Sequence, residues 1–235
     1  MTAADILTEL KLLGHESYKK VMLNHGAKEP FYGVKIEDLK KIQKRIKRDY
    51  QLALDLYDTG VSDAMYLAGL IADDAKMTKK DLQHWAERAY FPLMSECTVP
   101  WVAAESEHGR EMALKWIESK KENVAAAGWS TFSSLVGITA DDDLDLRELK
   151  KLLARVGKTI HHQPNRVRYV MNGFVIAVGS YVKALTDSAI QTAKRIGKVS
   201  VEMNGTACKV PDAIAYIQKV ADRRGIGKKR ATAKC

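Results

Sequence analysis

Long apolar runs and flexible linkers are absent from this sequence. Only five prolines occur among 235 residues, and no stretch rich in proline, glycine or serine separates two domains. No apolar run approaches the roughly 20 residues that a membrane span needs. The first residues, Met1–Asp5, lack the basic start and apolar core of a signal peptide. These absences predict one cytoplasmic domain over residues 1–222, with no membrane association.

Cysteines and catalytic signatures are also scarce. Cys97, Cys208 and Cys235 are far apart and match neither a disulfide framework nor the spacing of zinc ligands, so we expect reduced thiols. The sequence contains no P-loop, no dinucleotide-binding glycine motif, no HExxH and no GxSxG. His161 and His162 have no further ligands at useful spacing. We therefore expect neither a metal site nor a small-molecule cofactor.

Apolar residues recur with helical period along most of the chain. Residues 36–46 show the pattern, and stops between helices are indicated at 59–60, 140–141 and 162–164. Helices of about 10 to 17 residues joined by short turns predict an all-α fold, an α-solenoid of HEAT-like or armadillo-like helix pairs. A compact helical bundle is the alternative. Further helices are predicted to begin near Thr78, Thr98, His108, Glu122, Asp145, Asn165, Tyr181 and Pro211.

Positive charge is in surplus. The chain has 38 lysines and arginines against 29 aspartates and glutamates, a formal net charge of +9. Such a surplus favours polyanions, because counterions released from phosphates drive binding. Basic residues concentrate in residues 35–48, 147–158 and 223–234. We expect residues 223–235 to be a flexible basic tail that adds phosphate affinity or only solubility. The alternative for the whole surplus is a merely solvated surface.

One short helical segment combines an indole with a carboxylate. Pro100 suits the first turn of a helix, and Trp101 and Glu105 then stand four residues apart on one face. An indole can stack on a cationic ring while a carboxylate stabilises positive charge on a departing sugar. The alternative is that Trp101 packs in the core and Glu105 faces solvent.

Two more aromatic residues invite a comparison with nucleic-acid stacking surfaces. Trp129 follows a run of small residues, and Phe174 lies in a segment that begins with Arg166 and Arg168. A row of aromatic rings along a concave groove would stack bases, and arginines at a helix start could reach phosphates. Burial of both rings in the core is the alternative.

Residues 101–105, 166–179 and 205–213 together resemble the AlkD-like DNA alkylation repair proteins, and the resemblance covers roughly residues 30–220. It implies HEAT-like repeats whose concave, basic face holds duplex DNA. It also implies a DNA glycosylase that hydrolyses the N-glycosidic bond of N3- and N7-alkylated purines without a metal or cofactor. Members of this family need not flip the base into a pocket.

The resemblance assigns roles to individual residues. The family's Trp-x-x-x-Asp pattern falls on Trp101 and Glu105, which would stack on the lesion or backbone and stabilise the sugar cation. Phe174 would replace a second tryptophan. The family's arginine falls near Ala127 or Gly128, where this chain has none. Glutamate is also one methylene longer than aspartate, a displacement of about 1 Å that can cost about 100-fold in rate.

Three functions stay open. The chain is an alkylpurine DNA glycosylase, a catalytically silent protein that binds damaged or branched DNA, or a HEAT-type scaffold for a protein partner. We expect a monomer whose partner is duplex DNA, alkylated or structured. A shared face with Trp101 would support the DNA contacts predicted for Trp129, Phe174, Arg166, Arg168, Arg147, Lys151, Lys44 and Arg48.

Overall fold

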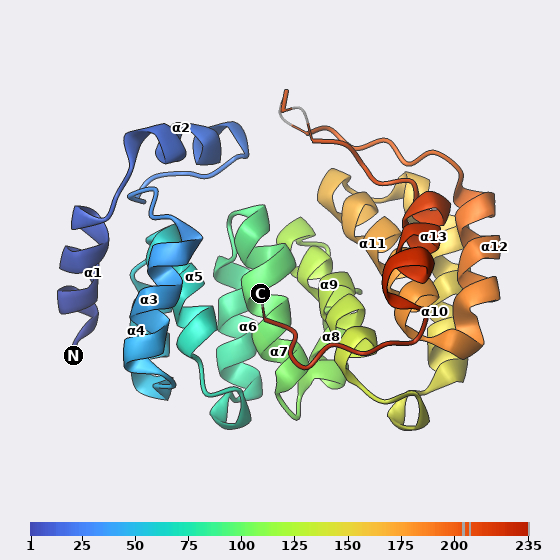
Figure 1. The fold of residues 1–235 in the computed structure, drawn as a ribbon, viewed down its shortest axis with the longest axis horizontal. Coiled ribbons are helices and arrows are strands. Elements are labelled where there is room, and N and C mark those ends of the chain that lie inside the picture. Colours follow the sequence, from blue (N-terminus) through green and yellow to red (C-terminus); the bar gives the residue numbers. More distant parts are fainter. Residues whose placement is uncertain (204, 207, 235) are drawn as a thin grey trace.

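Helices joined by short turns follow one another in the computed structural model, which describes residues 1–203, 205–206 and 208–234 (Figure 1). Within these ranges no strand occurs, only an isolated bridge between Gly14 and Val34. Cys235 lies outside the described residues. The helices are α1 (Ala3–Leu12), α2 (Glu16–Asn24), α3 (Ile36–Ile46), α4 (Tyr50–Asp58), α5 (Ser62–Ile71), α6 (Lys79–Arg88), α7 (Val99–Glu105), α8 (Gly109–Trp116), α9 (Glu122–Ile138), α10 (Leu146–Thr159), α11 (Asn165–Tyr181), α12 (Thr186–Ile196) and α13 (Ala213–Arg224).

Several connections between the α-helices contain short π-helical or 3₁₀ segments. A π-helical segment, Met94–Thr98, leads directly into α7. Short 3₁₀ segments cover Asp74–Lys76, Asp141–Asp143, Ile160–His162 and Lys183–Leu185. Between α12 and α13, residues 197–203, 205–206 and 208–212 contain no strand.

Successive helices pack against each other as pairs, and the pairs stack side by side. The pairs are α4/α5, α6/α7, α8/α9, α10/α11 and α12/α13, and the second helices pack in the row α5, α7, α9, α11 and α13 (Figure 1). We call this row the inner helices. The predicted α-solenoid of stacked helix pairs is confirmed.

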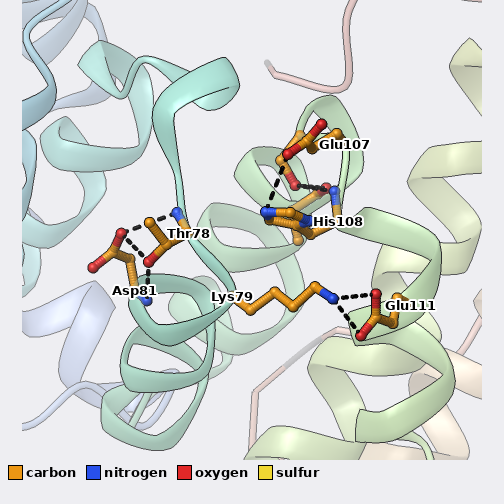
Figure 2. A network of polar contacts seen from close by, with 8 residues as sticks. Thr78, Lys79, Asp81, Glu107, His108 and Glu111 are labelled. Carbon is orange, nitrogen blue, oxygen red and sulfur yellow. Dashed lines mark hydrogen bonds and ion pairs between the residues drawn. The ribbon is translucent and has the colours of Figure 1, made fainter.

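Side-chain caps explain where many helices begin. Thr78 accepts the backbone N–H of Asp81, whose carboxylate in turn accepts the backbone N–H of Thr78, so α6 starts in a capping box (Figure 2). Asp145 caps α10, and Asp212 caps α13. These three helices begin close to the predicted starts, whereas the start predicted near Tyr181 is wrong, because α11 continues to Tyr181 and α12 begins at Thr186. Figure 2 also shows Lys79 of α6 reaching Glu111 of α8 at 2.6 Å, an exposed pair that contributes little to stability.

Two apolar clusters divide the core along the stack. The first joins α1 and α3–α9 and includes Trp85, which stacks on Tyr57 with ring centroids 4.1 Å apart. The second joins α8–α13 around Trp129 and Phe174. Within the described part of the chain no single helix is long and apolar enough to cross a membrane, although α11 and Lys183–Ile196, which meet at 118°, pass that test as a pair.

Two helical glycines predict opposite effects of an added methyl group. A Cβ at Gly128 would lie 2.7 Å from the backbone nitrogen of Ile117 and 2.9 Å from the Cβ of Trp116, whereas a Cβ at Gly173 would meet nothing within 4 Å. We expect Gly128→Ala to lower the free energy of unfolding by about 1–3 kcal/mol, because α8 and α9 must separate. Gly173→Ala should raise it by about 0.5–1 kcal/mol through helix propensity. Urea unfolding of both variants checks this; equal shifts would contradict it.

Candidate nucleic-acid interface

A groove of about 580 Å³ runs along three of the inner helices, α7, α9 and α11. Tyr18 and Met22 of α2 form one wall, and Met203 and Cys208 form the opposite edge. The floor comes from the segment leading into α7, and from α9 and α11. The two edges meet where Cys208 Sγ lies 4.0 Å from His25 Nδ1. Helices α8, α10 and α12 contribute no residue to the lining among those described.

A buried ion pair stands in the floor of the groove. The Nε and Nη2 atoms of Arg166 each donate to one carboxylate oxygen of Glu96 at 2.6 Å, and the guanidinium lies 4.5 Å from the ring centroid of Tyr169. Burial raises the pKa of Glu96, and the hydrogen bonds from Arg166 oppose that shift. Burial alone would lower the pKa of Arg166, but its bonds to Glu96 raise it. The charge of Arg166 is therefore balanced inside the protein.

The two residues of the predicted catalytic pair have different surroundings. Trp101 lines the groove but is only 6% exposed, and its indole meets the ring of Tyr66 edge-on at 5.6 Å. Glu105, the last residue of α7, is not among the described residues that line the groove. Its carboxylate accepts the hydroxyl of Thr232 and, at 2.7 Å, the backbone N–H of Ala233. The carboxylate is thus already bound by the segment after α13.

Trp129 and Phe174 lie in the core, where the sequence suggests an exposed stacking surface. Trp129 is 1% exposed and Phe174 is fully buried. Their ring centroids are 5.3 Å apart, and Phe132 meets Phe174 at 6.1 Å. Because α9 and α11 pack against each other on the side that carries these rings, no ring face is left for a base.

The predicted basic contacts do not gather beside Trp101. Arg166 lines the groove, whereas Arg168 is half-buried and donates to Asn165 at 3.2 Å. The other four are exposed, on or beside helices whose basic residues stay outside the groove. These are Lys44 on α3, Arg48 just after it, and Arg147 and Lys151 on α10.

Several groove residues have no counterpart among the predicted ones. Glu96, Tyr18 and Tyr169 are the clearest cases. Small side chains also repeat along the floor, with Ser130 and Ser134 on α9 and Gly173 and Ala177 on α11. That spacing of four is a signal that the sequence could have supplied. Within the described ranges, no three histidine, cysteine, aspartate or glutamate side chains form a cluster that could hold a metal ion.

Comparisons with known proteins place the chain among repair proteins. A family model described as DNA alkylation repair enzyme matches residues 6–217. The chain belongs to this family. Uncharacterized proteins Lin0241 of Listeria innocua and Lmo0209 of Listeria monocytogenes are each 36% identical over 222 residues, covering 92% of this chain and 96% of theirs.

A solved structure resembles the whole chain. It is described as a new family of proteins related to the HEAT-like repeat DNA glycosylases with affinity for branched DNA structures. It is 36% identical, covers 100% of both chains and gives a TM-score of 0.93. The HEAT-like solenoid and the resemblance to DNA alkylation repair proteins are thereby confirmed.

The family's arginine cannot be supplied from the expected place. Ala127 is fully buried, and Gly128 has no room even for a Cβ. Glu105 supplies a carboxylate where the family pattern has aspartate, but that carboxylate is bound to Thr232 and Ala233. Of the features that the resemblance implies for excision, the indole of Trp101 alone lies in the groove among the described residues.

Proposed function

We propose that this protein binds branched or otherwise structured DNA through the groove and does not excise alkylated purines. The observation that carries the proposal is the contrast within α7: Trp101 lines the groove, whereas the carboxylate of Glu105 lies outside the lining and is bound by Thr232 and Ala233. The full-length likeness to a protein with affinity for branched DNA supports the same ligand. The net charge of +9 supplies the attraction to phosphate.

The groove carries groups suited to nucleic acid. Tyr18 of α2 and Tyr169 of α11 both line the groove with aromatic rings. Aromatic rings contribute about 1–3 kcal/mol per stacked base without sequence preference. Unpaired or unstacked bases at a branch point are more accessible to such rings than bases inside a duplex. This favours structured DNA over a regular duplex.

Exposed lysines beside the groove provide the test. Lys28 lies just after α2, three residues beyond His25, and Lys209 directly follows Cys208; His25 and Cys208 both line the groove. We expect fluorescence anisotropy to show tighter binding to a four-way junction than to a linear duplex of equal length. Neutralising Lys28 and Lys209 to glutamine should reduce the salt dependence by about one unit of slope for each lost phosphate contact.

The matched control lies on α10. Lys150 and Lys151 are equally exposed but stand on a helix that contributes nothing to the groove lining. Replacing both with glutamine removes the same total charge as the double variant at the groove edge. Because α10 lies outside the groove, this replacement should weaken DNA binding less. Equal losses in the two variants would contradict the groove as the binding surface. Binding that is absent or independent of salt would contradict DNA as the ligand.

Alkylpurine excision is the second candidate, favoured by the place of Trp101 in the groove and by the family match. Incubation of methylated duplex DNA with a stoichiometric amount of protein decides between the two. The proposal expects no release of 7-methylguanine or 3-methyladenine. Release that falls sharply in Trp101→Ala and Glu105→Gln would establish excision instead. Glu105→Gln removes the charge but keeps an acceptor oxygen for Thr232 and Ala233.

A further inference from the structure

The segment after α13 returns across the inner helices instead of leaving the protein. Figure 1 shows it running from α13 back towards the middle of the molecule. We call residues 226–234 the strap. Its backbone N–H groups donate to three inner helices in turn: Gly227 to Ser180 O of α11 (2.9 Å), Arg230 to Gly137 O of α9 (2.8 Å) and Ala233 to Glu105 Oε1 of α7 (2.7 Å).

Two strap lysines bind near helix C-termini. Lys229 Nζ donates to Val136 O of α9 at 2.9 Å, and Lys234 Nζ donates to Ala72 O, just after α5, at 3.3 Å. The last carbonyls of a helix lack partners within the helix, and the negative end of its dipole favours cations. The strap thus follows the C-terminal ends of α11, α9, α7 and α5 in order.

The inner end of the strap is buried. Ala233 has no exposed surface and belongs to the same apolar cluster as Trp101. Lys234 Nζ lies 2.9 Å from Asp74 Oδ2, with side chains 12% and 6% exposed. The sequence predicts a flexible tail from residue 223, but these contacts describe a docked segment. Burial of this extent is expected for a segment that binds specifically to the helices of its own chain.

The strap also reaches the groove. Arg230 lines it together with Tyr181 and Ala177 of α11, so the strap closes the end of the groove where α9 and α11 finish. One turn after Trp101, the strap occupies the carboxylate of Glu105. DNA that extends along the inner helices past Trp101 would meet the strap.

We propose that the strap is a built-in competitor of DNA, which holds Glu105 and one end of the groove until it is displaced. This inference rests on the proposed function of the groove. A ligand that binds only the open form has an apparent affinity reduced by the open fraction. A strap docked for about 90% of the time therefore weakens apparent DNA binding about tenfold.

Ala233→Pro releases the strap without changing its charge. Proline removes the N–H that binds Glu105, and its ring enlarges a fully buried side chain. The control is Ala231→Ser, because Ala231 is exposed. We expect the Kd for a four-way junction to fall about tenfold in Ala233→Pro and to stay unchanged in Ala231→Ser, by fluorescence anisotropy at fixed salt.

A released strap could also bind DNA through its own cations. A chain ending at Gly225 tests this, with Asp74→Asn added so that no carboxylate is left buried without Lys234. Its affinity is compared with that of Asp74→Asn alone, and thermal melting followed by circular dichroism confirms that each variant folds. Tighter binding in both the proline variant and the shortened chain supports competition.

Three results overturn the proposal. If Ala233→Pro binds the junction more tightly but the folded shortened chain does not, the freed basic residues of the strap bind DNA directly. If the wild type binds the junction and Ala233→Pro binds it with the same affinity, the strap does not compete with DNA, although the proposed DNA binding by the groove is still supported. Absence of binding in the wild type and all variants would contradict both the competition and the proposed function.

Discussion

Replacing Phe174 with alanine is expected to lower the free energy of unfolding by about 3–5 kcal/mol, because a fully buried ring is removed from between Trp129 and Phe132. The surrounding helices cannot collapse fully into the space, so a cavity adds to the lost transfer free energy. DNA binding by the fraction that stays folded should be unchanged. Urea unfolding and anisotropy measured on the same preparation separate the two effects.

Tyr169→Ala on the same helix is the matched comparison. Tyr169 is half-buried, lines the groove and lies under the guanidinium of Arg166. Its loss should weaken junction binding by about 1–3 kcal/mol, the contribution of one stacked base. The stability loss should be smaller than for Phe174→Ala, because the ring is less buried. If Phe174→Ala unfolded no more easily than Tyr169→Ala while losing DNA affinity, Phe174 would be a stacking residue after all.

The opposite roles of these two aromatic residues show what periodicity cannot decide. Residues 165–181 form the predicted helix, and helices begin directly after Thr78, His108 and Asp145, where starts are predicted. Inner helices, however, are covered by their pair partner and by neighbouring inner helices, so apolar residues surround most of their circumference. A pattern that is apolar on several sides does not identify the side that faces a groove.

The sequence analysis does not predict the groove wall formed by α2, because that helix has too weak an apolar pattern rather than one that covers several sides. The aliphatic residues of α2 are the consecutive Val21–Leu23 and do not recur along the helix as a stripe, and the structure buries none of them. Val21 and Leu23 on α2 are 48% and 45% exposed, which breaks the usual relation between hydrophobicity and burial. Tyr18 and Met22, which line the groove, therefore gave no helical signal of the kind that identified residues 36–46.

Linear clusters of charge do not show which charged side chains are already paired in the fold. Arg45 pairs with Glu9, and Arg155 pairs with Glu118, in both cases across helices of the stack. Arg166 pairs with Glu96, 70 positions earlier in the chain. The spacing of Trp101 and Glu105 did place them on one helix, but the partners of Glu105 come from residues 232 and 233. Contacts between distant segments decide which charges remain available, and a local pattern does not contain them.

Replacing Lys234 with methionine should lower the free energy of unfolding by about 3–5 kcal/mol at neutral pH, the usual cost of removing one partner of a buried ion pair. Asp74 depends on Lys234 because its Oδ2 accepts from Lys234 Nζ at 2.9 Å, while its Oδ1 has no hydrogen-bond partner among the described residues. Burial raises the pKa of Asp74, and Lys234 opposes that shift. Without the lysine, the buried carboxylate is left uncompensated.

The pH dependence distinguishes this cause from simple loss of packing. Without Lys234 the folded-state pKa of Asp74 should rise further, while the unfolded-state pKa keeps its ordinary value. The folded variant then binds a proton more tightly than the unfolded chain, so its deficit relative to wild type should shrink as pH falls through the raised pKa. The double variant Asp74→Asn/Lys234→Met should recover most of the loss at neutral pH. A deficit that is the same at neutral and acidic pH, and persists in the double variant, would assign the effect to packing of the strap instead.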